Sequence, residues 1–146
     1  MKKPKYRIID HPSDTGIDFF GKDLSESFIN AARGMYSIMI EEPDYILEKK
    51  ERAIEIDEKG IACIQDLLVL WLERLLYDFD TDQVIYCDID IKEIRLESGK
   101  GHMLANCSYT GIEPRMVKLG IKAVTYQDLY IKEYPGGYKG RVIFDV

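Results

Sequence analysis

Residues 64–79, Ile-Gln-Asp-Leu-Leu-Val-Leu-Trp-Leu-Glu-Arg-Leu-Leu-Tyr-Asp-Phe, are the stretch that decides the fold. Apolar side chains recur along it at spacings of three and four, and polar side chains such as Glu73 and Asp78 fall on the opposite side. This pattern predicts an amphipathic helix whose apolar stripe must be buried against a sheet. Burying eight such side chains would contribute about 10–20 kcal/mol gross, nearly all of it needed to offset chain entropy. The stripe consists of Ile64, Leu67, Leu68, Trp71, Leu72, Leu75, Leu76 and Phe79.

A second amphipathic helix is predicted upstream, over about residues 24–40. Asp23 followed by Glu26 is a variant of the capping box that starts helices, and Pro43 would end the element. Its apolar residues again recur every three or four positions; they are Leu24, Phe28, Ala31, Ala32, Met35, Ile38 and Met39.

Most of the remaining chain alternates apolar and polar residues, which predicts strands joined by turns at residues 98–101 and 134–138. The sequence therefore predicts an α+β fold of two layers, a mostly antiparallel sheet with two amphipathic helices packed on it. We expect a single domain over residues 1–146. A division into two halves is the alternative, because the chain starts with alternating strands and helices and finishes with strands alone. The predicted strands cover residues 5–9, 16–21, 52–57, 84–92, 103–109, 121–126, 129–132 and 141–145.

The composition argues against two classes of function, nucleic-acid binding and membrane association. The 26 acidic residues outnumber the 20 basic ones, and the resulting net charge of −6 predicts no strong direct binding of nucleic acid. No run of 18 apolar residues is present, so no membrane association is expected, and a cytosolic location is the default expectation. The cysteines Cys63, Cys87 and Cys107 form no C-x-x-C pair and are expected to be reduced and buried.

The segment His11-Pro12-Ser13-Asp14-Thr15-Gly16 is the first candidate for chemistry, and its position predicts a loop between two strands. Asp14-Thr15-Gly16 matches the catalytic tripeptide of small dimeric aspartic proteases. That function is disfavoured, because a shared-proton dyad needs an apolar strand and apolar cover, whereas His-Pro-Ser precedes this tripeptide. Asp14 could equally be an Asx-turn residue beside Gly16 or a metal ligand. The residues by themselves leave these alternatives open.

The other end of the chain offers a second group of oxygen atoms. Asp145 is followed by Val146 and its carboxylate, and clustered carboxylates suit hard cations such as Ca²⁺, Mg²⁺ or Mn²⁺. Lys122 interrupts an apolar strand and could either reach solvent or pair with Asp14 or Asp145. His11 could be a supporting ligand, but no nucleophile is marked out near it.

Six short elements, in this order and spacing, resemble the archease family over nearly the whole chain. The resemblance departs at Pro12 and Ser13, where the family usually has Thr-Ala, and at Gln127, where it commonly has His. The elements are residues 11–16, 21–32, 70–77, 117–118, 121–126 and 142–146.

The resemblance implies a non-enzymatic role. Archeases activate the tRNA-splicing RNA ligase by promoting its guanylylation and multiple turnover, through a metal held by two aspartates. By position these are Asp14 and Asp145, with Val146 as a further ligand and with Lys122 and His11 in support. We expect Ca²⁺ first, with Mg²⁺ or Mn²⁺ as alternatives. Two other functions stay open, namely a small metal-dependent hydrolase or phosphotransferase that uses the same carboxylates, and a chaperone-like binding module.

Overall fold

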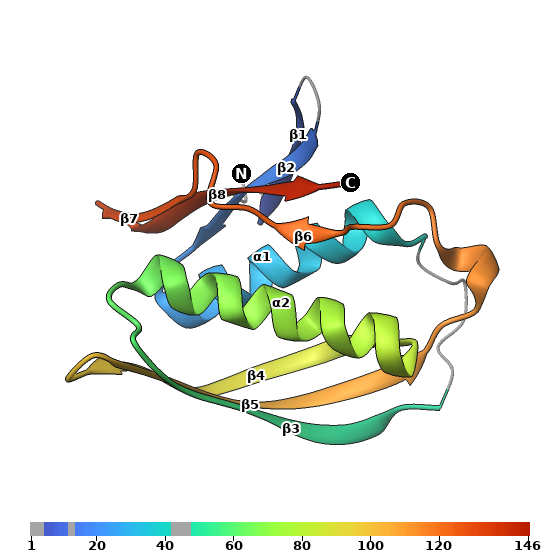
Figure 1. Ribbon diagram of the computed structural model, residues 1–146, viewed down its shortest axis with the longest axis horizontal. Coiled ribbons are helices and arrows are strands. Elements are labelled where there is room, and N and C mark those ends of the chain that lie inside the picture. The colour runs from blue at the N-terminus through green and yellow to red at the C-terminus, as the bar shows by residue number, and fades with distance from the viewer. Residues whose placement is uncertain (1–4, 12–13, 42–47) are drawn as a thin grey trace. The chain divides into compact units, whose positions relative to one another are not determined.

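The protein is described by a computed structural model that covers residues 5–11, 14–41 and 48–146 (Figure 1). These residues contain two α-helices, eight strands and a short 3₁₀ helix. Contacts along the chain divide it into two compact units, one formed by Met1–Ile40 together with Val117–Val146 and the other by Glu41–Met116.

The unit that contains both chain ends is a five-stranded antiparallel sheet with one helix, α1 (Leu24–Met39). The sheet order is β1-β2-β8-β6, and β7 also pairs with β8, so that β6 and β7 share one edge of β8. The strands are β1 (Tyr6–His11), β2 (Asp14–Gly21), β6 (Ala123–Val124), β7 (Tyr130–Tyr134) and β8 (Gly137–Asp145).

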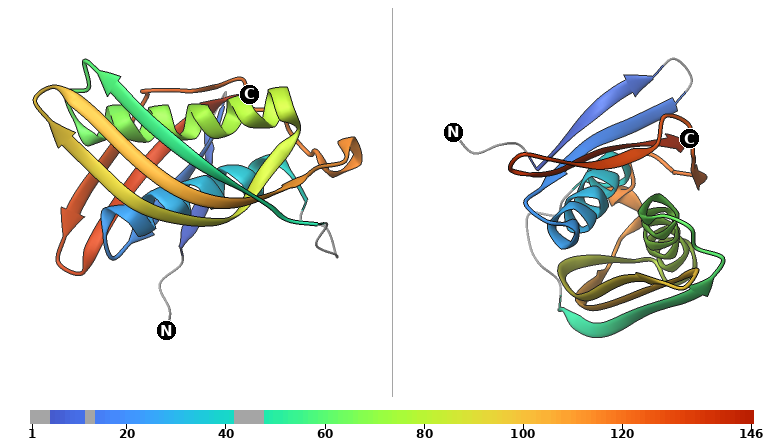
Figure 2. Two further views of the ribbon diagram at one scale, coloured as in Figure 1. Left: turned by 90° about the horizontal axis from the view of Figure 1, so that it is seen from below. Right: turned by 90° about the vertical axis from the view of Figure 1, so that its left-hand side faces the viewer.

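Helix α1 starts at the predicted cap and covers one face of this sheet. The backbone N–H of Glu26 donates to Asp23 Oδ1 at 2.8 Å, as the capping-box pattern predicts. Gly34 allows close packing, because a Cβ atom there would lie 2.7 Å from the Ile17 side chain of β2. Ile17 and Val142 therefore lie on the α1 side, and the residues that alternate with them lie on the opposite face, which carries no helix of this unit (Figure 2).

The Glu41–Met116 unit is a three-stranded antiparallel sheet with helix α2 (Ile64–Asp82). The order is β3-β5-β4, and α2 contacts β4 and β5 (Figure 2). Ser98 and Gly99 have φ values of 50° and 74° and join β4 to β5, as the sequence predicted for this hairpin. The strands are β3 (Lys50–Lys59), β4 (Val84–Glu97) and β5 (Lys100–Gly111), and the 3₁₀ helix is η1 (Pro114–Met116).

The predicted α+β class, both helices and the antiparallel pairing are confirmed. The expected single sheet is instead two sheets, each with its own helix. The predicted strand over residues 121–126 shortens to Ala123–Val124, and Asp78, predicted on the polar side of its helix, is only 4% exposed. Cys63, expected to be buried, is exposed. The prediction of one domain over residues 1–146 stays a prediction.

No helix in the described part of the chain is long and apolar enough to cross a membrane.

Candidate metal site

The pairing of β2 with β8 brings the two ends of the chain together at the predicted metal ligands. In this antiparallel register Thr15 pairs with Phe144 and Gly16 with Ile143. One further step along the same register sets Asp14, the first residue of β2, opposite Asp145, the last residue of β8. Directly opposed residues in antiparallel strands have Cα atoms roughly 4.5–5.5 Å apart and project their side chains from the same face.

The neighbouring strands bring the other predicted residues to the same end of the sheet. On one side, His11 of β1 pairs with Asp14. On the other side, Ala123 pairs with Asp145, and the backbone N–H of Lys122 donates to the Asp145 carbonyl at 2.7 Å. The sheet thus brings His11, Asp14, Lys122 and Asp145 to one of its ends, and Val146 follows Asp145 directly in the chain.

Lys122 contacts this site through its backbone N–H group. The residue is exposed and immediately precedes β6, outside the regular strand. The sequence predicted a strand that includes Lys122, but the regular strand begins only at Ala123.

The close approach of β2 and β8 depends on Gly16. A Cβ atom at Gly16 would lie 2.6 Å from Cδ1 of Ile143 and 2.7 Å from the Val142 carbonyl oxygen, so the Ile143 side chain occupies the space above the glycine. The other edge of β8 is held by Thr125, whose backbone N–H and Oγ1 hydroxyl both donate to the Ile143 carbonyl, at 3.0 and 2.9 Å. Glycine in the Asp-Thr-Gly tripeptide thus serves strand packing.

The candidate ligand atoms are oxygen atoms, which hard divalent cations prefer. Like charges placed directly opposite on adjacent strands destabilise a sheet, and a cation between them would remove that cost. Asp14 is half-buried and Asp145 is exposed, which leaves room for water to complete the coordination. Within the described ranges, however, no group of three or more His, Cys, Asp or Glu side chains could hold a metal ion. Two carboxylates and main-chain oxygen atoms would therefore have to do so.

The structure corrects the predicted position of Asp14 and gives the position of Gln127. Asp14 was expected in a loop, but it begins β2 and pairs with His11, the last residue of β1; Pro12 and Ser13 lie outside the described residues. Gln127 lies in the turn between β6 and β7, and its backbone N–H donates to Thr125 Oγ1 at 3.3 Å.

A second polar cluster on the same sheet was missed from the sequence. Asp18 is 4% exposed, and its carboxylate accepts hydrogen bonds from Arg141 Nε and Nη2 at 2.7 and 3.1 Å and from Arg7 Nη2 at 3.0 Å. The sequence feature that could have indicated this cluster is Asp18 itself, a single acidic residue within the apolar run from Ile17 to Phe20. The bidentate arginine is the strongest partner for a buried carboxylate.

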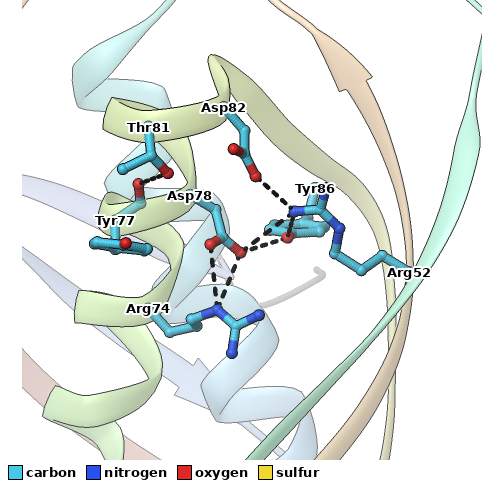
Figure 3. Close-up of polar contacts among 7 residues, drawn as sticks. All are labelled: Arg52, Arg74, Tyr77, Asp78, Thr81, Asp82 and Tyr86. Carbon is cyan, nitrogen blue, oxygen red and sulfur yellow. Dashed lines mark hydrogen bonds and ion pairs between the residues drawn. The ribbon is translucent and has the colours of Figure 1, made fainter.

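A third cluster, around Asp78 of α2, is structural (Figure 3). The Tyr86 hydroxyl donates to Asp78 Oδ2 at 2.5 Å, and Arg74 Nε lies 3.2 Å from both carboxylate oxygens. Arg52 donates to the Tyr86 hydroxyl and to Asp82, at 3.0 and 3.1 Å. Burial and the adjacent Asp78 carboxylate raise the pKa of Tyr86 to about 12, which keeps it a hydrogen-bond donor. The cluster joins α2 to β3 and β4 with its buried charge satisfied.

Two open cavities of about 590 and 570 Å³ are lined by residues of the Glu41–Met116 unit, and neither includes a predicted site residue.

The sequence was compared with protein families and curated proteins. Residues 6–146 match the model of the Archease protein family (MTH1598/TM1083). The protein archease of Methanosarcina mazei is 31% identical over 144 residues, which cover 97% of this chain and 96% of that protein. The protein archease of Archaeoglobus fulgidus is 30% identical over 147 residues, which cover 97% and 99%.

Solved structures agree with the fold. The solution structure of Methanobacterium thermoautotrophicum protein 1598 superimposes with a TM-score of 0.78 at 27% identity and covers 97% of this chain and 99% of that one. A Thermotoga maritima crystal structure, described as an archease and possible chaperone, gives a TM-score of 0.52 at 18% identity over 100% of this chain and 98% of that one, which bears on the fold alone.

Proposed function

The chain belongs to the archease family, and we propose that it is a non-enzymatic accessory protein of the tRNA-splicing RNA ligase. In this proposal it docks on the ligase and promotes attachment of GMP to the active-site histidine of that enzyme, which supports multiple turnover. Asp14, Asp145 and the main-chain oxygen atoms of Val146 would hold a divalent cation near the nucleotide site of the ligase.

The observation that supports this proposal is the register of β2 and β8, which aligns Asp14 with Asp145 although 130 positions separate them in sequence (145 − 14 − 1). A bound cation would supply positive charge that phosphate oxygens can coordinate. The residues of the chain hold that charge at a strand end, and the exposed Lys122 beside Asp145 adds a charge that attracts phosphate. Ca²⁺ is proposed first because it accepts oxygen ligands in flexible geometry, with Mg²⁺ and Mn²⁺ as alternatives.

A guanylylation assay tests the proposal. Purified ligase is incubated with labelled GTP, with and without this protein, and the covalently bound GMP and ligation turnover are measured. We expect Asp14→Asn and Asp145→Asn each to reduce the stimulation by about 10-fold or more, as losses of metal ligation usually do. Calorimetry with Ca²⁺ should show the same variants losing metal binding.

Asp10→Asn is the matched control. Asp10 is exposed, pairs with Thr15 at the same end of the sheet, and by strand alternation projects from the face opposite to Asp14. The control removes the same charge and should leave both stimulation and metal binding unchanged. Full stimulation by both site variants would refute the metal role, whereas nucleotide or phosphoester turnover by the isolated protein would favour the hydrolase or phosphotransferase alternative.

A further inference from the structure

The face of the five-stranded sheet opposite α1 carries a concentration of basic and aromatic side chains. Along β7, Tyr130, Lys132 and Tyr134 alternate with the buried Ile131 and pair with Arg141, Lys139 and Gly137 of β8. Directly opposed residues share a face, and Ile131 pairs with Gly140, which packs on Phe19 on the α1 side. The tyrosines and the cations therefore project together, away from α1.

We call this surface the basic face and define it by Arg7, Tyr130, Lys132, Tyr134, Lys139 and Arg141.

The cations and aromatic rings of the basic face are interleaved. Lys132 Nζ lies 5.3 Å from the ring centroid of Tyr130, and Lys139 Nζ lies 5.9 Å from that of Tyr134. Lys132 is exposed, and the Arg7 side chain is 65% exposed. Lys139 and Arg141 are two residues apart on β8, which is about 7 Å along the strand.

Asp128 lies near Arg141, and Asp18 lies among these cations without cancelling their charge. Asp18 is buried beneath Arg7 and Arg141, and its two oxygen atoms hold both guanidinium groups in place. Four cations against Asp18 and Asp128 leave this part of the sheet positive, although Asp14 and Asp145 lie farther along the same side and the whole chain carries a net charge of −6. The global charge predicted no strong nucleic-acid binding, but a local basic patch overrides that expectation where it is concentrated on one face.

We propose that the basic face binds single-stranded RNA, with phosphates on the arginines and lysines and bases stacked on Tyr130 and Tyr134. Tyr130 and Tyr134 are half-buried, and a sheet surface that carries both cations and aromatic rings is the arrangement by which proteins bind unpaired strands. An acidic protein surface would neutralise the cations but would leave the rings without a role. The choice of RNA over DNA rests on the proposed function, because the enzyme that it assists joins RNA.

The basic face and the candidate metal site lie on the same side of one sheet. Strand β8 runs through both, and the four residue steps from Arg141 to Asp145 span about 13 Å at the usual strand rise. An RNA strand that follows β8 would therefore bring one of its ends toward Asp14 and Asp145. In this arrangement the protein would orient RNA beside the site that it presents to the ligase.

Fluorescence anisotropy with a labelled oligouridylate of about 12 nucleotides tests RNA binding, since ordinary single-strand sites span about 4–16 nucleotides. The full chain is used, with EDTA present so that no metal contributes. Each phosphate neutralised on a single strand contributes about −0.7 to the slope of log affinity against log salt, so four cations predict a slope near −2 to −3. The same measurement is made with an RNA duplex of equal length.

Lys132→Glu/Lys139→Glu should weaken binding at least 10-fold and reduce the magnitude of the salt slope by about 1.4. The matched control is Lys50→Glu/Lys59→Glu, which makes the same change in net charge at exposed positions of β3 in the other unit. It should retain the affinity within about 2-fold, because single-strand binding depends on the charges of the groove itself. Tyr134→Ala should lose about 5-fold or more and Tyr134→Phe should retain binding, since stacking needs only the ring. Circular dichroism confirms that each variant is folded.

Three outcomes would overturn this proposal: no binding by the unaltered protein at low salt, equal loss in the control and test variants, or duplex binding as tight as single-strand binding. Retained RNA affinity in Lys132→Glu/Lys139→Glu with lost ligase binding would instead identify a protein-docking surface. RNA binding is measured in EDTA and metal binding by calorimetry with Ca²⁺, so failure of the metal proposal and failure of this one are distinguishable.

Discussion

At the scale of single residues, Asp18 shows how neighbouring charges determine the state of a buried group. Its carboxylate is almost wholly removed from water, which by itself would favour the protonated form. The hydrogen bonds from Arg141 outweigh this effect and, together with those from Arg7, hold the pKa of Asp18 below its ordinary value. The same contact raises the pKa of Arg141. The pair therefore stays charged and fixed in place.

This lowered pKa predicts an acid-sensitive contribution to stability. Because the folded-state pKa lies below the unfolded value of 3.8, the contribution is fully present above that value and is lost as pH falls through the folded-state pKa. Asp18→Asn should therefore reduce the free energy of unfolding at pH 7 and make it less dependent on pH below about 4. Urea titrations at pH 7 and at pH 2–4 would check this. Identical acid dependence in the variant and the unaltered protein would contradict it.

At the scale of elements, the candidate site depends on how closely β2 approaches β8. Glycine at position 16 leaves space for Ile143, and no side chain would fit there without moving that residue or the backbone of Val142. The contact lies two residues from each predicted aspartate, so a shift of either strand would separate the ligands.

Gly16→Ala is accordingly expected to destabilise the protein by about 1–3 kcal/mol through overpacking and to weaken metal binding. Gly120→Ala is the control, because a Cβ atom at Gly120 would meet nothing within 4 Å. Thermal unfolding and calorimetry with Ca²⁺ would measure the two effects. A Gly16→Ala protein as stable as the control would show that the strands adjust without cost.

At the scale of the whole chain, one unit is inserted into the other. The segment Glu41–Met116 begins and ends at adjacent positions, since Ile40 bridges Val117 and the backbone N–H of Glu41 donates to the Met116 carbonyl at 2.8 Å. The sheet with the candidate metal site is therefore completed only when the last strand, β8, is present. The chain contains one tryptophan, Trp71, and it lies in the inserted unit.

The predicted single domain can be tested with Trp71. If residues 1–146 unfold as one domain, then Trp71 fluorescence and far-UV circular dichroism should report one urea transition. If Ca²⁺ binds the candidate site in the folded state alone, then at about 100 times its Kd it should raise the free energy of unfolding by about 2.7 kcal/mol in both signals. A circular dichroism transition that Ca²⁺ shifts, beside a Trp71 transition that it leaves unchanged, would show that the inserted unit unfolds independently.

The sequence by itself determined the local elements, because side-chain periodicity and capping are local properties. The stripe from Ile64 to Phe79 specified α2, Asp23 and Glu26 specified the start of α1, and Ser98-Gly99 specified a hairpin. The candidate ligands Asp14 and Asp145 came from carboxylate chemistry together with family resemblance.

Only the tertiary structure decided which distant residues are neighbours. The register of β2 against β8 aligns Asp14 with Asp145, and the pairing across the sheet sets Arg7 and Arg141 on either side of Asp18. The division of the strands into two sheets has the same origin. Alternation along a strand shows which residues share a face, but it does not contain the partner strand or the register. For β2 and β8, both result from packing between segments more than 100 residues apart.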